Sequence, residues 1–209
     1  MSIVRKKAPG FTARAIVNGD ELQEDFSLSQ FHGKKYVVLF FYPKDFTYVC
    51  PTELFAFQEK LAEFESINTA VVGCSCDSHE VHLAWLSTPK NRGGIEGITY
   101  PLIADVSKTI AANFGVLGGE YGYNENDEMV FEGLPFALRG TFIMDKDGVI
   151  RSSMINDLPL GRNIDDTLRL VKALQHTEKH GEVCPANWDE GKDTMKETRE
   201  SVANYLATH

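Results

Sequence analysis

Long apolar runs are missing from this 209-residue sequence, and cysteines are few. No run approaches the roughly 18 apolar residues of a membrane-spanning helix, so we expect no membrane role. The first ten residues contain basic side chains but no apolar segment after them, so they do not read as a signal peptide. Four cysteines are too few for a secreted disulfide scaffold, and a cytoplasmic, reducing compartment is therefore the expectation.

Positive charge is also scarce. The 21 Lys and Arg residues stand against 30 Asp and Glu, which gives a formal net charge of −9. This balance repels phosphate backbones and anionic lipids, so nucleic-acid and membrane-surface partners are disfavoured. Internal repeats and low-complexity tracts are absent from the sequence as well, which leaves an ordinary globular chain.

Two apolar runs and a helical pattern between them predict the centre of the fold. Residues 36–42 form a continuous β-rich run, as a strand buried on both faces does. Leu54, Phe57, Leu61 and Phe64 then recur at helical spacing, and residues 70–76 form a second buried run. Strand, helix and strand in this order predict a parallel pair of strands.

The rest of the chain continues the alternation. We expect helices over residues 79–87, 107–114 and 163–176, the last capped by Asn163, and a hairpin of strands 141–144 and 149–155. The pattern predicts an α/β sandwich with a central mixed sheet flanked by helices. Residues 181–209 are polar and poor in large apolar groups, so we predict a domain over 1–180 and a C-terminal arm over 181–209 that needs another surface to become ordered.

The segment after the first buried strand holds the densest chemical signal. Pro51 suits the first helical position, which makes Cys50 the N-cap residue and puts Glu53 at the third helical position. Unpaired backbone N–H groups and the positive end of the helix dipole meet there, and a sulfur at that place favours the reactive thiolate. A small buried cysteine without chemistry is the alternative, and Thr47 could equally be an ordinary turn residue.

Cys74, Cys76, His79 and His82 place four soft ligands close together and invite a zinc interpretation. Cysteines two apart in a strand point to one face, however, and that face of a central strand is normally packed. We therefore expect core residues there and no metal site. The sequence also lacks a C-x-x-C pair, the main signature of a dithiol oxidoreductase.

Pro43, Thr47 and Cys50, spaced Pro-x-x-x-Thr-x-x-Cys, resemble the active-site signature of the peroxiredoxins. Further segments match the typical two-cysteine subfamily in the family's order and extend the resemblance over nearly the whole chain: Asp77–His79, His82–Trp85, Arg139–Ile143, Asn156–Arg162 and Val183–Pro185. The resemblance implies a thioredoxin-like fold and a thiol-dependent peroxidase.

The resemblance also implies roles for single residues. Cys50 would be the peroxidatic cysteine that attacks hydrogen peroxide or an alkyl hydroperoxide. Thr47 and Arg139 would donate to the departing oxygen, and Glu53 would steer the arginine through a fork-type pair. Pro43 and Pro51 would shield the pocket, with Trp85 as a supporting residue.

Ionisation of the sulfur alone makes a modest catalyst. An ordinary thiol is roughly 3% thiolate at pH 7, so complete ionisation raises the reactive fraction about 30-fold, or ~2 kcal/mol. Lower basicity also blunts nucleophilicity. Most of the acceleration must therefore come from donors that stabilise the breaking O–O bond.

Recycling is implied by the resemblance alone. The sulfenic acid on Cys50 would condense with Cys184 of a second subunit in a homodimer, and dimers would assemble into a decamer. Thioredoxin or a flavoprotein reductase would reduce the disulfide, and no metal, haem or flavin would be needed as a cofactor. A spare surface thiol is the alternative for Cys184. Holdase-type chaperone activity and a redox relay to a signalling partner remain alternative functions.

Two regions depart from the family pattern. Residues 117–138 are longer than the corresponding family loop, acidic and free of Lys and Arg, and a flexible solvated loop is the plain interpretation. Residues 93–97 and the pair Tyr205-Leu206 only partly resemble the Gly-Gly-Leu-Gly loop and Tyr-Phe tail of members that over-oxidise easily. We therefore expect intermediate sensitivity to over-oxidation.

Overall fold

A computed structural model describes residues 2–208, which divide into two compact units. The first unit extends to Arg162, and the second begins at Asn163. The expected boundary after residue 180 falls at the end of a helix inside the second unit, so the division into 1–180 and 181–209 stays a prediction.

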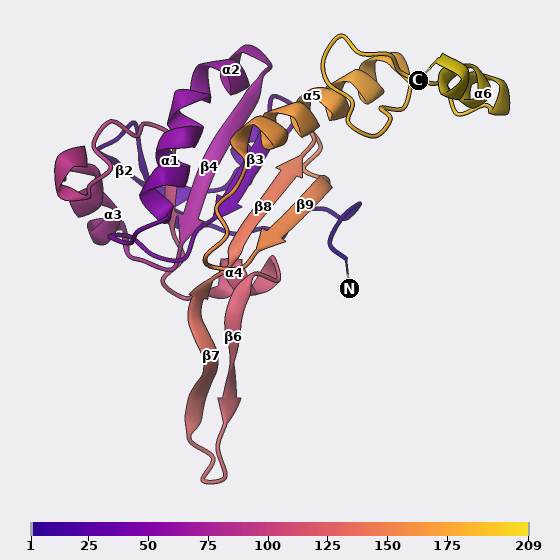
Figure 1. Ribbon diagram of the computed structural model, residues 1–209. Helices are drawn as coiled ribbons and strands as arrows, with labels where there is room; N and C mark the ends of the chain where they lie inside the picture. Colours follow the sequence, from indigo (N-terminus) through magenta and orange to yellow (C-terminus); the bar gives the residue numbers. More distant parts are fainter. Residues whose placement is uncertain (1, 209) are drawn as a thin grey trace. The chain divides into compact units, whose positions relative to one another are not determined.

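A seven-stranded mixed sheet is the frame of the first unit (Figure 1). Its strands, in the spatial order β2-β1-β5-β4-β3-β8-β9, are β2 Glu21–Phe26, β1 Ala13–Val17, β5 Leu102–Ala104, β4 Thr69–Ser75, β3 Tyr36–Phe41, β8 Arg139–Met144 and β9 Ile150–Asn156. The neighbours β3, β4 and β5 run parallel, whereas the other four neighbouring pairs of the sheet are antiparallel. The predictions of a mixed sheet and of a parallel strand pair around residues 36–76 are confirmed.

Short helices connect these strands. They are η1 Leu28–Phe31, α1 Cys50–Glu59, α2 Leu61–Ser66, α3 His79–Leu86, η2 Lys90–Arg92 and α4 Thr109–Asn113. The single helix expected over Leu54 to Phe64 is two helices, because the chain turns at Lys60 between α1 and α2. Leu54, Phe57 and Phe64 are nevertheless buried, as the periodicity predicted.

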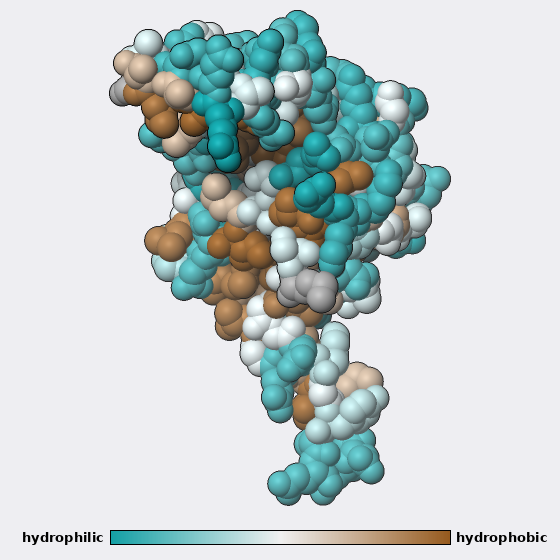
Figure 2. Space-filling model, turned by 90° about the vertical axis from the view of Figure 1, so that its right-hand side faces the viewer, coloured by the Kyte–Doolittle hydropathy of each residue, from teal (hydrophilic) through white to brown (hydrophobic). Residues whose placement is uncertain are grey.

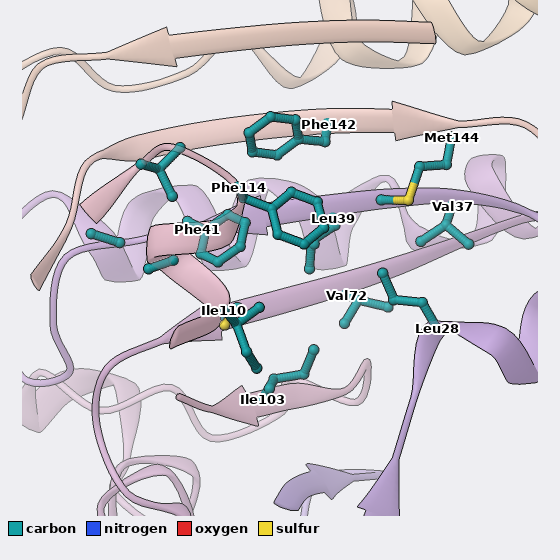
Figure 3. Close-up of a cluster of buried hydrophobic side chains, with 14 of the residues drawn as sticks. Leu28, Val37, Leu39, Phe41, Val72, Ile103, Ile110, Phe114, Phe142 and Met144 are labelled. Carbon is teal, nitrogen blue, oxygen red and sulfur yellow. The ribbon is translucent and has the colours of Figure 1, made fainter. Parts of the chain in front are cut away.

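Strand β3 is buried on both faces, and this explains its uninterrupted apolar sequence. On one face Val37, Leu39 and Phe41 join a core cluster with Phe114, Phe142 and Met144, all of which Figure 3 labels. On the other face Phe40 stacks on Phe57 of α1, with ring centroids 4.2 Å apart. The strand is therefore fixed in register, and the chain leaves its end toward α1 from a rigid position.

Residues 117–138 form a hairpin and not the solvated loop that their composition suggested. Strands β6 Leu117–Tyr123 and β7 Met129–Ala137 pair antiparallel and extend away from the sheet, at the lower end of β8 in Figure 1. Glycine makes this possible near the base, where a Cβ on Gly119 would lie 2.1 Å from the Glu132 carbonyl oxygen and Gly133 has φ +91°. The plain interpretation of a flexible solvated loop did not anticipate these two paired strands, although most of their residues are exposed or half-buried.

The second unit consists of helix α5 Ile164–His180 and the chain after it, which ends in α6 Arg199–Thr208. The expected cap is confirmed, because Asn163 Oδ1 accepts a hydrogen bond from Asp166 N at 3.0 Å. Gly181, with φ +66°, ends the helix. The predicted arm packs in part against α5: Arg169 donates to the Trp188 carbonyl, and Trp188 is buried. Across the described residues, helices that combine the length and the apolarity needed to cross a bilayer are not found.

Candidate active site

Cys50 lies at the first turn of α1, where β3 delivers the chain, and its side chain is 1% exposed. The helix begins one residue earlier than expected: Val49 is the N-cap residue, and Cys50 is itself helical. The predicted N-cap position of Cys50 and third-position placement of Glu53 were therefore wrong by one residue. The sulfur still lies among the N–H groups of the first turn, so the electrostatic argument is retained.

Arg139, the first residue of β8, faces Cys50. Its Nη1 lies 3.5 Å from Cys50 Sγ and 2.6 Å from Glu53 Oε2, while its Nε donates to the Leu158 carbonyl at 2.7 Å. The guanidinium is 4% exposed, so its charge is largely removed from water. The fold thus brings Cys50 and Arg139, two predicted site residues that lie 89 positions apart in the sequence, into contact.

Glu53 holds two guanidinium groups and does not turn back toward the helix cap. Its Oε2 accepts from Arg139 and, at 3.0 Å, from Arg162 Nη1; its Oε1 accepts from the backbone N–H of Arg162 at 3.0 Å. Arg139 therefore contacts the carboxylate through one nitrogen and not through the predicted fork. Strong charge-assisted bonds of this kind fix the position of both cations.

Arg162 is the site residue that the sequence did not single out. Burial lowers the pKa of Arg162 to about 10, against the opposing effect of Glu53. The guanidinium also donates to the carbonyl oxygens of Phe41 and Gly140. In the sequence analysis, Arg162 was only the last residue of a segment that resembles the family. The one clue to its role was its position as a cationic residue directly before the helix cap Asn163.

The groups around Cys50 carry an excess of positive charge. Two buried guanidinium groups face the single carboxylate of Glu53, which leaves a formal excess of one positive charge. Buried charge that is not balanced costs several kcal/mol, so this arrangement favours the presence of an anion beside Arg139. It also offers hydrogen-bond donors to any anion that forms beside it.

Thr47 and Pro43 line the loop between β3 and α1. Pro43 is buried, whereas Thr47 is half-buried and donates from Oγ1 to the Lys44 carbonyl at 2.8 Å. The structure thus places the Thr47 hydroxyl in a local turn. Pro51 lies in the first turn of α1 as its second residue, one position later than expected.

Trp85 lies behind this loop and not against the sulfur. It is fully buried in α3, its Nε1 donates to the Gly93 carbonyl at 2.8 Å, and its ring packs near Phe46 and Tyr42. Its place in the fold is to support the segment that holds Thr47 and Cys50.

A buried polar network anchors the same loop. Asp45 accepts from Tyr42 Oη at 2.8 Å and lies 2.7 Å from His82 Nδ1, while His82 Nε2 donates to the Ile103 carbonyl at 3.1 Å. Burial raises the pKa of Asp45, and the neighbouring His82 opposes this. Burial disfavours the charged form of His82, but the hydrogen bond and charge of Asp45 outweigh it and raise the pKa of His82. Asp45 and His82 therefore retain protons that exposed residues would release.

The residues of the zinc interpretation lie in separate environments. Cys74 belongs to the apolar core cluster, Cys76 packs against that cluster, and His82 is engaged by Asp45. Burial raises the pKa of Cys74 well above its usual range and that of Cys76 to about 12. Within residues 2–208, we find no group of three or more His, Cys, Asp or Glu side chains arranged to hold a metal ion.

Cys184 belongs to the second unit. It is half-buried, and its Sγ lies 3.8 Å from Thr177 Oγ1 and 3.7 Å from the Ala173 carbonyl oxygen of α5. It is a free thiol, as are the other three cysteines.

A thioredoxin-like sheet that presents a buried sulfur to two buried cations defines a thiol-dependent oxidoreductase. Residues 4–153 match the model of the AhpC/TSA family, and residues 173–208 match the model named C-terminal domain of 1-Cys peroxiredoxin. The chain therefore belongs to the AhpC/TSA family, the peroxiredoxins, and is a thiol-dependent peroxidase.

Relatives resemble the chain over its full length. Alkyl hydroperoxide reductase C of Helicobacter pylori is 46% identical over 98% of this chain and 96% of that protein. Peroxiredoxin-2 of Mus musculus is also 46% identical, over 99% of this chain and 96% of that protein. The reduced 2-Cys peroxiredoxin of Plasmodium vivax superposes with a TM-score of 0.88 at 40% identity, covering 99% of this chain and all of that one.

Proposed function

We propose that Cys50 is the peroxidatic residue and that it reduces hydrogen peroxide and small alkyl hydroperoxides. The thiolate attacks one peroxide oxygen, the O–O bond breaks, and the other oxygen leaves as hydroxide or alkoxide, which takes up a proton. Cys50 becomes a sulfenic acid. The contact of 3.5 Å between Arg139 Nη1 and Cys50 Sγ carries this proposal, because it puts a buried cation where the negative charge develops.

Arg139, Glu53 and Arg162 would work as one unit in this step. Glu53 holds both guanidinium groups in place before the peroxide arrives, so they need not reorganise when the O–O bond stretches. Thr47 would add a second donor if its hydroxyl turns from the Lys44 carbonyl toward the peroxide. Pro43 and Pro51 would keep water from the sulfur.

Cys184 is the proposed resolving residue. Its thiol would condense with the sulfenic acid on Cys50 of a second chain, releasing water and leaving a disulfide between subunits. A dithiol reductant, thioredoxin or the dithiol of a flavoprotein reductase, would then restore both thiols in the cytoplasm. We further propose that such homodimers assemble into a decamer.

Non-reducing gel electrophoresis after one equivalent of hydrogen peroxide tests these roles. Wild type should run as a covalent dimer, whereas Cys50→Ser and Cys184→Ser should both remain monomers. Cys184→Ser should still consume one equivalent of peroxide, but Cys50→Ser should consume none. An oxidised wild-type monomer would mean that the bridge forms within one chain. Peroxide consumption by Cys50→Ser would refute the assignment of the nucleophile.

A further inference from the structure

The hairpin formed by β6 and β7, residues 117–137, has two chemically different faces. Residues paired across antiparallel strands share a face, and the pairs alternate along the hairpin. One face holds the pairs Tyr121↔Phe131 and Tyr123↔Met129, whose members Tyr123 and Met129 are 70% and 64% exposed. The other holds Glu120↔Glu132, both exposed. We call this element the acidic hairpin.

The acidic hairpin contains no positively charged side chain to offset its carboxylates. Like charges directly opposite on paired strands are destabilising, and no Lys or Arg occurs between residues 117 and 138 to separate Glu120 from Glu132. Among the described residues its two strands pair only with each other, and an isolated two-stranded hairpin is marginal in water. A cationic surface with some apolar area would therefore stabilise it.

The same chain presents such a surface at the other end of β8 and β9. Three segments of the chain lie side by side there. Arg5 N donates to the Ile150 carbonyl and Gly33 N donates to the Lys146 carbonyl, and each hydrogen bond is 2.8 Å long. We call this the basic end; its cations are Arg5, Lys6, Lys7, Lys34, Lys35, Lys146 and Arg151, and its carboxylates are Asp145 and Asp147. In a chain of net charge −9, this excess of cations is unusual.

The acidic hairpin and the basic end of one chain point to opposite ends of β8. Strand β7 ends at Ala137, just before β8 begins at Arg139, whereas Lys146 follows the far end of β8 at Met144. Figure 1 shows the hairpin extending away from that sheet, and Figure 2 shows its hydrophilic tip standing clear of the body. A contact between the acidic hairpin and a basic end therefore requires a second copy of the chain.

The edge of the sheet gives the relative orientation. Strand β9 ends the sheet order, has no strand on its outer side among the described residues, and exposes Met154 and Ile155. Two copies placed antiparallel along β9 set the Ile150 end of one against the Asn156 end of the other, which brings each basic end to the partner's hairpin. The seven residues of β6 span about 23 Å, enough to reach across it.

We propose that the acidic hairpin of one chain docks on the basic end of a second copy, with Glu120 and Glu132 receiving its lysines. The interface is reciprocal, so each pair of subunits has two such contacts. Hairpin-to-hairpin pairing is disfavoured because it sets five carboxylates against five. The acidic hairpin would hold the pair together whether or not a disulfide is present.

Carbodiimide cross-linking of reduced wild type tests the contact directly. Mixed ¹⁴N and ¹⁵N chains are equilibrated, cross-linked and digested, and the peptides are identified by mass spectrometry. Mixed-isotope links from Glu120, Glu128 or Glu132 to Lys34, Lys35 or Lys146 are expected. Hairpin links that reach only other regions of the second chain, or the formation of no hairpin links while other links between subunits form, would overturn the proposal.

Charge reversal gives a second test by native mass spectrometry of subunit exchange. Glu120→Lys/Glu132→Lys and Lys34→Glu/Lys146→Glu should each exchange at least about tenfold faster than wild type, because each sets like charges face to face. A mixture of the two variants should form heterodimers that exchange at nearly the wild-type rate. The matched control Glu59→Lys/Glu65→Lys, on α1 and α2, should exchange like wild type. Equal rates for all four proteins would mean that the hairpin faces a different partner.

Discussion

At the scale of single residues, the site depends on one carboxylate that holds two guanidinium groups in place. Glu53 binds Arg139 and Arg162 together, and Arg139 in turn contacts Cys50. Arg139 uses Nε for the Leu158 carbonyl and Nη1 for the other two groups, so its function depends on the shape of the guanidinium as well as on its charge.

We therefore expect Arg139→Lys to lower kcat/KM for hydrogen peroxide about 100-fold. A lysine keeps the charge, but its single nitrogen cannot reach Leu158, Glu53 and the sulfur together. Stopped-flow peroxide consumption measures the effect, with Arg14→Lys as the control, since Arg14 forms an exposed pair with Glu24. A loss of less than about threefold would show that the guanidinium shape is not required.

The pair Asp45–His82 predicts a pH dependence of stability. The pKa of His82 is higher in the folded than in the unfolded chain, so the folded state binds more protons above pH ~6.5. The stabilisation is complete below that pH and is lost as the pH rises through the folded-state pKa. The raised pKa of Asp45 acts with the same sign at lower pH.

Urea unfolding of wild type and His82→Asn from pH 5 to 9 tests this. The stability difference between the two proteins should be largest near pH 5 to 6 and should shrink as the pH rises. His79→Asn is the control, because His79 lies outside the buried network and pairs with the exposed Glu80. A difference that is constant with pH would contradict proton retention by the pair.

At the scale of helices and strands, sequence patterns succeeded where one signal dominated. The apolar run of β3 and the Asn163 cap of α5 were predicted because burial on two faces and a capping side chain leave clear local signatures. Strands β1, β2 and β5 were not predicted. Strand β5 has only three residues and β2 is mostly exposed, so neither of these two shows a strong apolar pattern. The hairpin was missed because its glycines and carboxylates read as loop composition.

The same limit applies to the site. Cys50, Thr47 and Arg139 lie in recognisable segments, whereas the role of Arg162 depends on contacts with Glu53, Phe41 and Gly140 that are distant in sequence. The start of α1 was displaced by one residue because Val49 adopts a helical conformation that no local rule indicated.

The cap of α5 can be tested by itself. Asn163→Ala should destabilise the protein by about 1 kcal/mol, because the N–H of Asp166 loses its side-chain acceptor. Asn163→Ser should retain most of the stability, since serine also caps helices well. Amide hydrogen exchange at the first turn of α5 locates the effect, and unchanged protection there in Asn163→Ala would contradict it.

At the scale of the whole molecule, charge is distributed unevenly around a net value of −9. The acidic hairpin and the basic end face opposite directions along β8, while Cys50 lies near the end of the sheet from which the hairpin extends. The chemistry and the assembly surfaces therefore involve neighbouring parts of the fold, and the pairing of subunits would act on the segment just before Arg139.

The C-terminal helix predicts a further property of the whole enzyme, its tendency to over-oxidise. Leu206 of α6 is mostly exposed. The partial resemblance of Tyr205-Leu206 to the Tyr-Phe tail implies that Leu206 replaces the phenylalanine of members that over-oxidise easily. Leu206→Phe should increase the fraction of Cys50 converted to sulfinic acid at a given peroxide concentration by about threefold, because a larger apolar side chain holds the tail more firmly. Mass spectrometry of the Cys50 peptide measures it, and Ala207→Ser serves as the control. An unchanged fraction would remove the tail from the account.

The raised pKa values of Cys74 and Cys76 have a consequence for which disulfides can form under oxidative stress. A sulfenic acid reacts with whichever thiolate reaches it first, and the raised pKa values of Cys74 and Cys76 keep both sulfurs protonated at physiological pH. Cys74 is buried and Cys76 is half-buried. Because a protonated thiol is a poor nucleophile, we expect neither to intercept the intermediate. Cys74 and Cys76 would therefore take no part in the proposed reaction between Cys50 and Cys184, and a chain with four cysteines would complete repeated cycles without forming other disulfides.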